Sequence, residues 1–86
     1  EPGFYKEGEY GIRIENILIV KKENENLLGF ENISWAPIDT DLIEISLLNS
    51  NEVKWLNDYH QTVFEKLSIF LTSDEKLWLQ EVTLPL

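Results

Sequence analysis

The sequence predicts an α+β fold in which short strands come first and two helices follow. Three observations carry this prediction. Alternating and β-branched apolar residues fill positions 10–35, a pattern that is typical of strands. After position 49 the apolar residues recur at steps of three and four, as an amphipathic helix requires. Two capping-box patterns, beginning at Asn49 and Thr72, mark the N-termini of two helices.

The strand-forming half begins with a lead-in at residues 1–8, which is rich in glycine and is expected to form turns. Residues 10–22 are expected to form two short strands or one bent strand, because Asn16 interrupts the apolar pattern. The β-branched run at residues 17–20 suits a strand that is covered on both faces.

A polar turn at residues 22–26 leads to a third predicted strand at residues 27–35. Phe30 and Ile33 are expected to face inward from this strand. Pro37 is expected to close it, because proline has no amide hydrogen to donate to a ladder.

Residues 39–48 form an apolar-rich connector with room for one helical turn. The helix that begins after Asn49 is expected to bury one stripe of side chains, which consists of Val53, Leu56, Tyr59 or His60, Val63, Leu67, and Phe70 or Leu71. A shorter helix begins after Thr72 and is expected to run to about Val82, with Pro85 beyond its end.

Composition excludes several classes of protein. Seven basic and sixteen acidic residues give a net charge of −9, which argues against binding to nucleic acid or to an anionic membrane surface. The absence of cysteine excludes disulfides, thiolate zinc sites and thiol nucleophiles. No apolar stretch approaches the roughly 20 residues of a membrane span. The chain has no methionine and begins Glu-Pro-Gly, which indicates either a processed product or the C-terminal piece of a longer protein. We expect the second.

Most residues that are able to carry chemistry have a structural interpretation. His60, the single histidine, is expected to be a partly exposed helical side chain, because no orienting partner is evident for it. The three tryptophans fall in apolar-patterned segments, which favours core or interface packing over a ligand platform. Asp39 and Asp41 beside Pro37 fit a turn better than a cation site.

One polar cluster lies in a segment with a strand pattern. Arg13 and Glu15 are two residues apart and therefore share one face of a strand. Their spacing alone fits an ion pair on a solvated face. An inward-facing glutamate would instead need a metal or a hydrogen-bonded cation.

The segment 1–16, Glu-Pro-Gly-Phe-Tyr-Lys-Glu-Gly-Glu-Tyr-Gly-Ile-Arg-Ile-Glu-Asn, resembles the end of the catalytic domain of Xaa-Pro aminopeptidases, which are pita-bread metallopeptidases. The remainder resembles the C-terminal extension of the longer members. The matching pieces are Leu-Gly-Phe-Glu at 28–31, Ala-Pro-Ile-Asp at 36–39, Trp-Leu-Asn-Asp-Tyr-His at 55–60, Trp-Leu at 78–79 and Thr-x-Pro at 83–85. The resemblance covers nearly the whole chain, and the order and spacing of its pieces make it specific.

The resemblance implies a domain boundary and a metal site. Residues 1–22 would be the end of the pita-bread catalytic domain, and residues 23–86 would be an extension of one strand and two helices. Glu1 and Glu15 correspond to two of five protein ligands of a dinuclear metal centre, most consistent with Mn²⁺ because oxygen-rich sites suit that ion. The strand alternation, and not the resemblance, sets Arg13 on the same face as Glu15, so we expect Arg13 to orient the carboxylates of these ligands.

The resemblance also implies a function for the parent protein, a cytoplasmic metalloaminopeptidase that removes the N-terminal residue from peptides with proline at the second position. The upstream catalytic domain would supply the other ligands, so the isolated chain is expected to be inactive. A homodimer is expected, with Trp55, Tyr59 and Trp78 at an interface. The alternative from another class is a free-standing acidic interaction module without catalysis.

Overall fold

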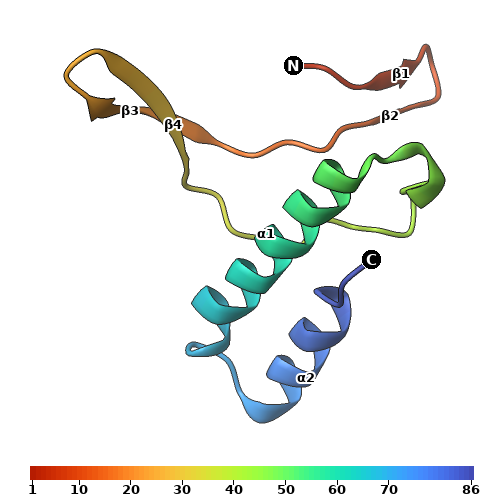
Figure 1. Cartoon of the computed structure of the whole chain (residues 1–86). Helices are drawn as coiled ribbons and strands as arrows, with labels where there is room; N and C mark the ends of the chain where they lie inside the picture. Colours follow the sequence, from red (N-terminus) through yellow and green to blue (C-terminus); the bar gives the residue numbers. More distant parts are fainter. The chain divides into compact units, whose positions relative to one another are not determined.

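The computed structural model describes all of residues 1–86 and contains four strands, one 3₁₀ turn and two helices (Figure 1). The chain divides into two compact units, residues 1–34 and residues 35–86. All strands lie in the first unit and all helices in the second, so the predicted α+β class is confirmed.

The first hairpin pairs β1 (Phe4–Lys6) with β2 (Tyr10–Ile12) in antiparallel register, with Tyr5 opposite Gly11. Gly8 in the connecting turn has a φ of 71°, a conformation that glycine adopts without a steric cost. β1 is a strand that was not predicted, because it lies within residues 1–8, for which a turn-rich lead-in is expected. A strand of three residues between glycines is too short to produce a periodic signal.

The second hairpin pairs β3 (Leu18–Asn24) with β4 (Leu27–Asn32), with Val20 opposite Phe30. Residues 10–22 therefore do contain two strands, as predicted. β4 ends three residues before the predicted end of the third strand. Beyond it, side-chain hydrogen bonds of Asn32 and Ser34 take the place of a continuing ladder.

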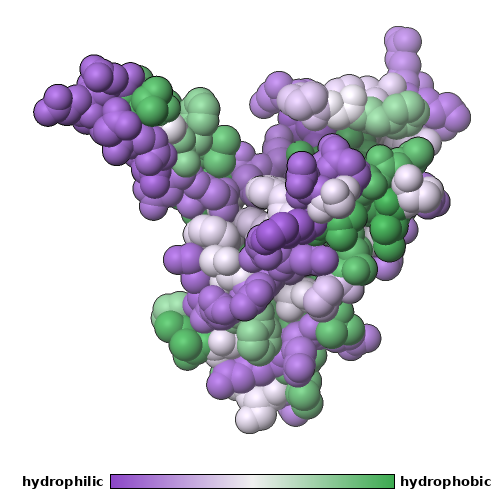
Figure 2. Space-filling model, in the orientation of Figure 1, coloured by the Kyte–Doolittle hydropathy of each residue, from purple (hydrophilic) through white to green (hydrophobic).

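Apolar side chains of both hairpins remain exposed, including Val20 at 62% and Phe30 at 68% (Figure 2). Residues 17–20 and Ile33 are exposed as well. The expectation of inward-facing and doubly covered strands is therefore wrong within this chain, because a two-stranded hairpin has no second layer of its own. Large exposed apolar patches are uncommon on the surfaces of monomeric soluble proteins.

The two helices begin where their caps predict. α1 (Ser50–Ser68) has a complete capping box between Asn49 and Glu52, with both N···O distances at 2.9 Å. α2 (Ser73–Val82) has the same arrangement between Thr72 and Glu75. The predicted helical turn in the connector is present as η1 (Ile45–Leu47). Neither helix combines the length and the apolar character that a membrane span requires.

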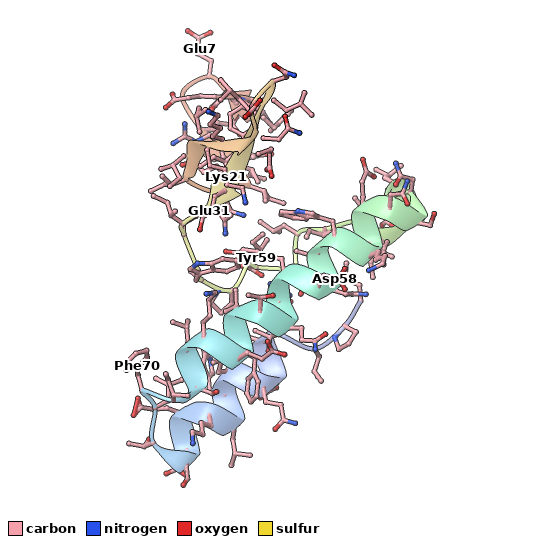
Figure 3. The ribbon with its side chains drawn as sticks, turned by 60° about the vertical axis from the view of Figure 1, so that its left-hand side comes forward. Glu7, Lys21, Glu31, Asp58, Tyr59 and Phe70 are labelled. Carbon is pink, nitrogen blue, oxygen red and sulfur yellow. The ribbon has the colours of Figure 1, made fainter.

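The core of the second unit lies between α1 and α2. Its fully buried apolar members are Leu56, Tyr59, Val63 and Leu79. Partly buried side chains surround them and come from both helices and from the flanking segments, namely Trp35, Ile38, Ile43, Phe64, Leu67, Leu71, Val82 and Leu86. The predicted stripe of α1 supplies Leu56, Tyr59, Val63, Leu67 and Leu71 to this core. Val53 is half-buried and lies outside the core, and Phe70 stays exposed at the turn between the helices (Figure 3).

The extended segment after β4 is hydrogen-bonded to α1. The Tyr59 hydroxyl donates to the Ala36 carbonyl at 3.0 Å and accepts from the Ala36 amide at 3.2 Å. The Ile38 amide donates to Nε2 of His60 at 3.0 Å. At the C-terminus of the chain, the amide of Leu86 donates to Oδ1 of Asn57 on α1 at 2.8 Å.

His60 is fully buried, with 0% of its surface exposed. The prediction of a partly exposed side chain is therefore wrong. No signal in the helix itself indicates that residues 35–38 fold back over it. Burial lowers the pKa of His60, and the Ile38 amide also favours the neutral ring, because it donates to the nitrogen that a proton would occupy.

Candidate functional site

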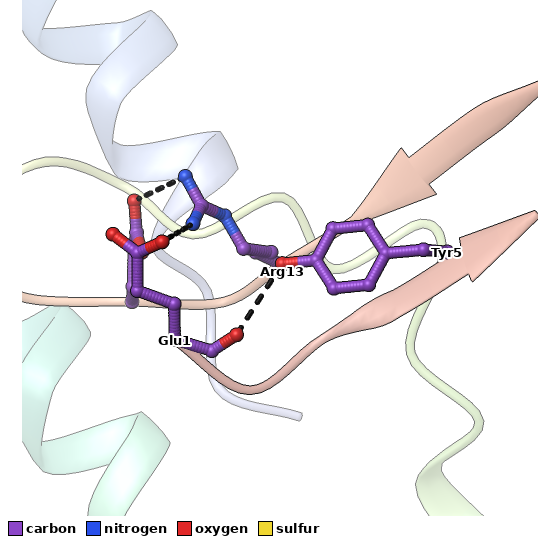
Figure 4. A network of polar contacts seen from close by, with 4 residues as sticks. Glu1, Tyr5 and Arg13 are labelled. Carbon is purple, nitrogen blue, oxygen red and sulfur yellow. Dashed lines mark hydrogen bonds and ion pairs between the residues drawn. The ribbon is translucent and has the colours of Figure 1, made fainter.

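Three of the predicted site residues meet beside the first hairpin. Arg13 lies between Glu1 and Glu15, with Nη1 at 3.3 Å from Oε2 of Glu1 and Nη2 at 3.3 Å from Oε1 of Glu15 (Figure 4). Both carboxylates are more than half exposed, whereas Arg13 is 35% exposed. One guanidinium therefore holds two carboxylates that are 14 positions apart in the chain.

The register of the hairpin explains this convergence. In each pair of β1 and β2 the residue numbers add to 16, so the same register continued beyond the ladder sets Gly3 opposite Arg13 and Glu1 opposite Glu15. Residues at every second position share a face of a strand. The two strand directions thus deliver both glutamates and the arginine to the same side of the hairpin.

Two glycines make room for the bulky members of this face. A side chain at Gly3 would place Cβ at 2.7 Å from Cγ of Arg13 and at 3.0 Å from the Ile12 carbonyl oxygen. A side chain at Gly11 would place Cβ at 2.9 Å from the ring of Tyr5. The arginine and the tyrosine therefore each lie over a glycine of the opposite strand.

Tyr5 completes the arrangement from the other end. Its hydroxyl donates to the backbone carbonyl of Glu1 at 3.4 Å (Figure 4). The backbone of Glu1 is thereby linked to the hairpin on one side, while its carboxylate is linked to Arg13 on the other. No site role was predicted for Gly3, Tyr5 or Gly11.

A signal for these three residues is nevertheless present in the sequence. Glu-x-Gly-x-Tyr at positions 1–5 and Gly-x-Arg-x-Glu at positions 11–15 occupy mirrored positions about the turn. In this arrangement glutamate is matched with glutamate, and each glycine is matched with a large side chain. An antiparallel hairpin brings such mirrored positions face to face. The mirrored spacing would have indicated that the two motifs form one surface.

Both carboxylates of the cluster are paired with the Arg13 guanidinium, as the spacing of Arg13 and Glu15 predicts for an ion pair. Carboxylate oxygens are also donors that suit Mn²⁺ and Mg²⁺. The chain contains no group of three or more His, Cys, Asp or Glu side chains that would hold a metal ion. The donor set of this chain is therefore incomplete by itself.

The predicted interface residues lie in the second unit. Trp55 and Trp78 are 53% and 56% exposed, and Tyr59 is buried at 7%. The ring of Tyr59 is stacked between Trp35 and Trp55, with both centroid distances at 5.5 Å, and Figure 3 shows it projecting from α1. The rings of Trp55 and Trp78 are thus accessible to a partner, whereas Tyr59 is buried and stacks against the ring of Trp55.

The predicted turn at Asp39 and Asp41 is present. The carboxylate of Asp39 accepts a hydrogen bond from the Asp41 amide at 3.0 Å. The lone histidine accepts a hydrogen bond from the Ile38 amide on Nε2, within the second unit.

Comparison with known proteins agrees with the resemblance in the sequence. Residues 26–86 match the family model described as the C-terminal region of peptidase_M24. The probable Xaa-Pro aminopeptidase P of Coprinopsis cinerea is 47% identical over 95 residues, which cover 100% of this chain and 15% of that protein. The corresponding protein of Aspergillus flavus is 44% identical and is covered over 14% of its length.

A solved structure is also similar. The crystal structure of the X-prolyl aminopeptidase of Caenorhabditis elegans, described as a cytosolic enzyme with a dinuclear active site, matches 99% of this chain with a TM-score of 0.85 and 36% identity. The match covers 15% of that chain. The chain thus spans about 15% of the length of the relatives that it matches. With its residues 26–86 fitting the family model, the chain belongs to the family of C-terminal regions of M24 peptidases.

Proposed function

We propose that the chain is the C-terminal part of a dinuclear-metal Xaa-Pro aminopeptidase. The parent protein would remove the N-terminal residue from peptides with proline at the second position. Glu1 and Glu15 would be two of the five metal ligands. The observation that carries the proposal is the convergence of these two carboxylates on Arg13, in a chain whose relatives bear the name Xaa-Pro aminopeptidase.

The proposed division of the parent places residues 1–22 in the catalytic domain and residues 23–86 in the extension. The start of the family match at residue 26 supports this division. The boundary falls inside β3, whereas the compact units of the chain meet after Ser34. The β3–β4 hairpin would therefore belong to both parts, as a strand pair that joins them.

The metal chemistry follows from the donors. Two bound ions, which we propose to be Mn²⁺, would activate water for attack and stabilise negative charge on the peptide carbonyl oxygen. Glu1 and Glu15 would hold the ions through carboxylate oxygens. Arg13 would fix the direction of both carboxylates through its two ion pairs at 3.3 Å. Two donors are too few for two ions, so the isolated chain is expected to be inactive.

The exposed apolar surface of the first unit supports a large intramolecular partner. Phe30 and Leu28 of β4 are 68% and 73% exposed, and a lone hairpin with such side chains is marginal in water. The upstream catalytic domain of the same polypeptide would cover this surface. Membership in a peptidase family weighs against the alternative of a free-standing acidic interaction module.

We further propose that the parent is a cytoplasmic homodimer. The description of the worm relative as a cytosolic enzyme supports the location. The half-exposed rings of Trp55 and Trp78 would contribute to the dimer contact, with Tyr59 holding Trp55 in place. Alanine at Trp55 or Trp78 should then shift the sedimentation of the parent toward the monomer. Unchanged sedimentation would contradict the dimer proposal.

The ligand proposal is tested by substituting one carboxylate at a time in the full-length parent. Glu15→Gln and Glu1→Gln should each lower the bound metal, measured by elemental analysis after gel filtration, and abolish hydrolysis of an Xaa-Pro peptide. Glu7→Gln is the matched control, because Glu7 lies in the exposed turn of the same hairpin (Figure 3). Normal metal content and activity in both ligand variants would refute the proposal.

A further inference from the structure

A small polar network lies next to Glu15 in the chain. The hydroxyl of Ser34 accepts a hydrogen bond from the Ile17 amide at 2.8 Å. The same hydroxyl has two acceptors within reach, Oδ1 of Asn16 and Oδ1 of Asn32, each at 3.3 Å. One side chain from beyond β4 therefore touches both residues that follow Glu15.

Two further hydrogen bonds hold Ser34 itself in place. The side-chain amide of Asn32 donates to the Ser34 carbonyl at 2.8 Å. The Ile33 amide donates to the Ile17 carbonyl at 2.9 Å. Residues 16–17 are thus tied to residues 32–34 through both backbone and side chains.

The network is the least exposed part of the first unit. Asn16, Asn32 and Ser34 are half-buried, and Gly29 is the one other residue of the unit that is not exposed. This reverses the usual distribution, since the large apolar residues of the same unit lie on the surface. Polar groups that are withdrawn from water in this way need their hydrogen bonds, and so the network resists rearrangement.

Glu15 lies where regular structure is absent. β2 ends at Ile12 and β3 begins at Leu18, so no ladder fixes the residues between them. Before Glu15 in the chain, Arg13 contacts the carboxylate of Glu15. After Glu15, Ser34 holds Asn16 and the backbone amide of Ile17 through hydrogen bonds. A metal ligand held on both sides loses less freedom when the ion binds.

We propose that Ser34 is a positioning residue for Glu15, acting through Asn16 and the backbone of Ile17 to hold the carboxylate ready for a divalent ion. The proposal rests on the assignment of Glu15 as a metal ligand. It places a contributor to the metal centre beyond the proposed end of the catalytic domain at residue 22. A hydroxyl is required because it accepts from one partner and donates to another in the same position.

The test measures Mn²⁺ affinity in the full-length parent after its metal has been removed, by electron paramagnetic resonance of free Mn²⁺. Ser34→Ala should weaken Mn²⁺ binding about 10-fold, the lower end of the effect of groups that support metal ligands. Ser34→Thr keeps the hydroxyl and should restore wild-type affinity. Ser46→Ala is the matched control, because it removes a hydroxyl bonded to the carboxylate of Glu44 in the second unit.

The outcomes separate this inference from the proposed function. If wild type binds Mn²⁺, Glu15→Gln does not, and Ser34→Ala binds like wild type, the role of Ser34 is overturned and the proposed function stands. If Glu15→Gln binds Mn²⁺ like wild type, the assignment of Glu15 as a metal ligand is overturned, and the role of Ser34 is overturned with it. A lower melting temperature of metal-free Ser34→Ala with unchanged affinity would show a purely structural role and also overturn the inference.

A second variant covers the case in which Ser34→Ala does not fold. Asn16→Ala removes one acceptor of the Ser34 hydroxyl and leaves the bond from the Ile17 amide in place. It should weaken Mn²⁺ binding less than Ser34→Ala, yet measurably. Wild-type affinity in Asn16→Ala would contradict the proposed path from Ser34 to Glu15.

Discussion

Mild acid is expected to loosen the packing of the extended segment 35–38 on α1, because this packing holds the imidazole of His60 in its neutral form. The buried imidazole accepts the Ile38 amide on Nε2. A proton on that nitrogen turns the acceptor into a donor and leaves the amide without a partner. No ion pair of the chain includes His60 that would compensate the new charge.

The sign and size follow from proton linkage. The unfolded chain protonates His60 near pH 6.5, and burial lowers the pKa in the folded state. Below pH 6.5 the unfolded state therefore binds more protons, and the free energy of unfolding falls by up to about 1.4 kcal/mol per pH unit. Loss of the Ile38 hydrogen bond alone corresponds to about 1–3 kcal/mol. Well above pH 6.5 both states are neutral, and His60 contributes no pH dependence.

Tryptophan fluorescence during urea unfolding measures this effect, because Trp35, Trp55 and Trp78 all lie in the second unit. The free energy of unfolding is compared between pH 7.5 and pH 5.5 for the wild-type chain and for His60→Gln. Glutamine offers an acceptor oxygen to the Ile38 amide but does not titrate, and the sixteen acidic residues remain in both proteins. An equal pH dependence in the two chains would refute the role of His60.

Two further predictions concern the same unit and use the same urea assay. Tyr59→Phe keeps the ring between two tryptophans but leaves both backbone groups of Ala36 without the hydroxyl, so it should lower the free energy of unfolding by about 1–3 kcal/mol. Tyr10→Phe is the control, because it removes a hydroxyl from an exposed ring of the first unit, and it should leave the urea midpoint unchanged. An equal midpoint for both variants would contradict the reasoning. Asn49→Ala breaks the capping box of α1 and should lower the free energy of unfolding by about 1 kcal/mol, whereas an unchanged midpoint would show that the cap does not contribute.

The helices were predictable because their signals are local. A cap and its partner lie three residues apart, and the stripe of α1 repeats within two turns. The strands were harder to predict, since β1 has only three residues and β4 ends where Asn32 and Ser34 form hydrogen bonds with each other. The exposure of residues 17–20 was not predictable from their pattern, because a β-branched run suits a strand covered on both faces, whereas the hairpin that they form has no second layer.

The sequence by itself determined the family resemblance, the order of strands and helices, and the candidate ligands Glu1 and Glu15 with Arg13 beside them. Only the tertiary structure decided that Arg13 bridges both carboxylates, that Ser34 holds the residues after Glu15, and that His60 is buried beneath residues 35–38. The physical reason is the range of the interactions. Caps and periodicity act within a few residues, whereas these contacts, apart from that of Arg13 with Glu15, join residues 12–22 positions apart. The proximity of such residues depends on hairpin register and on how a segment folds back.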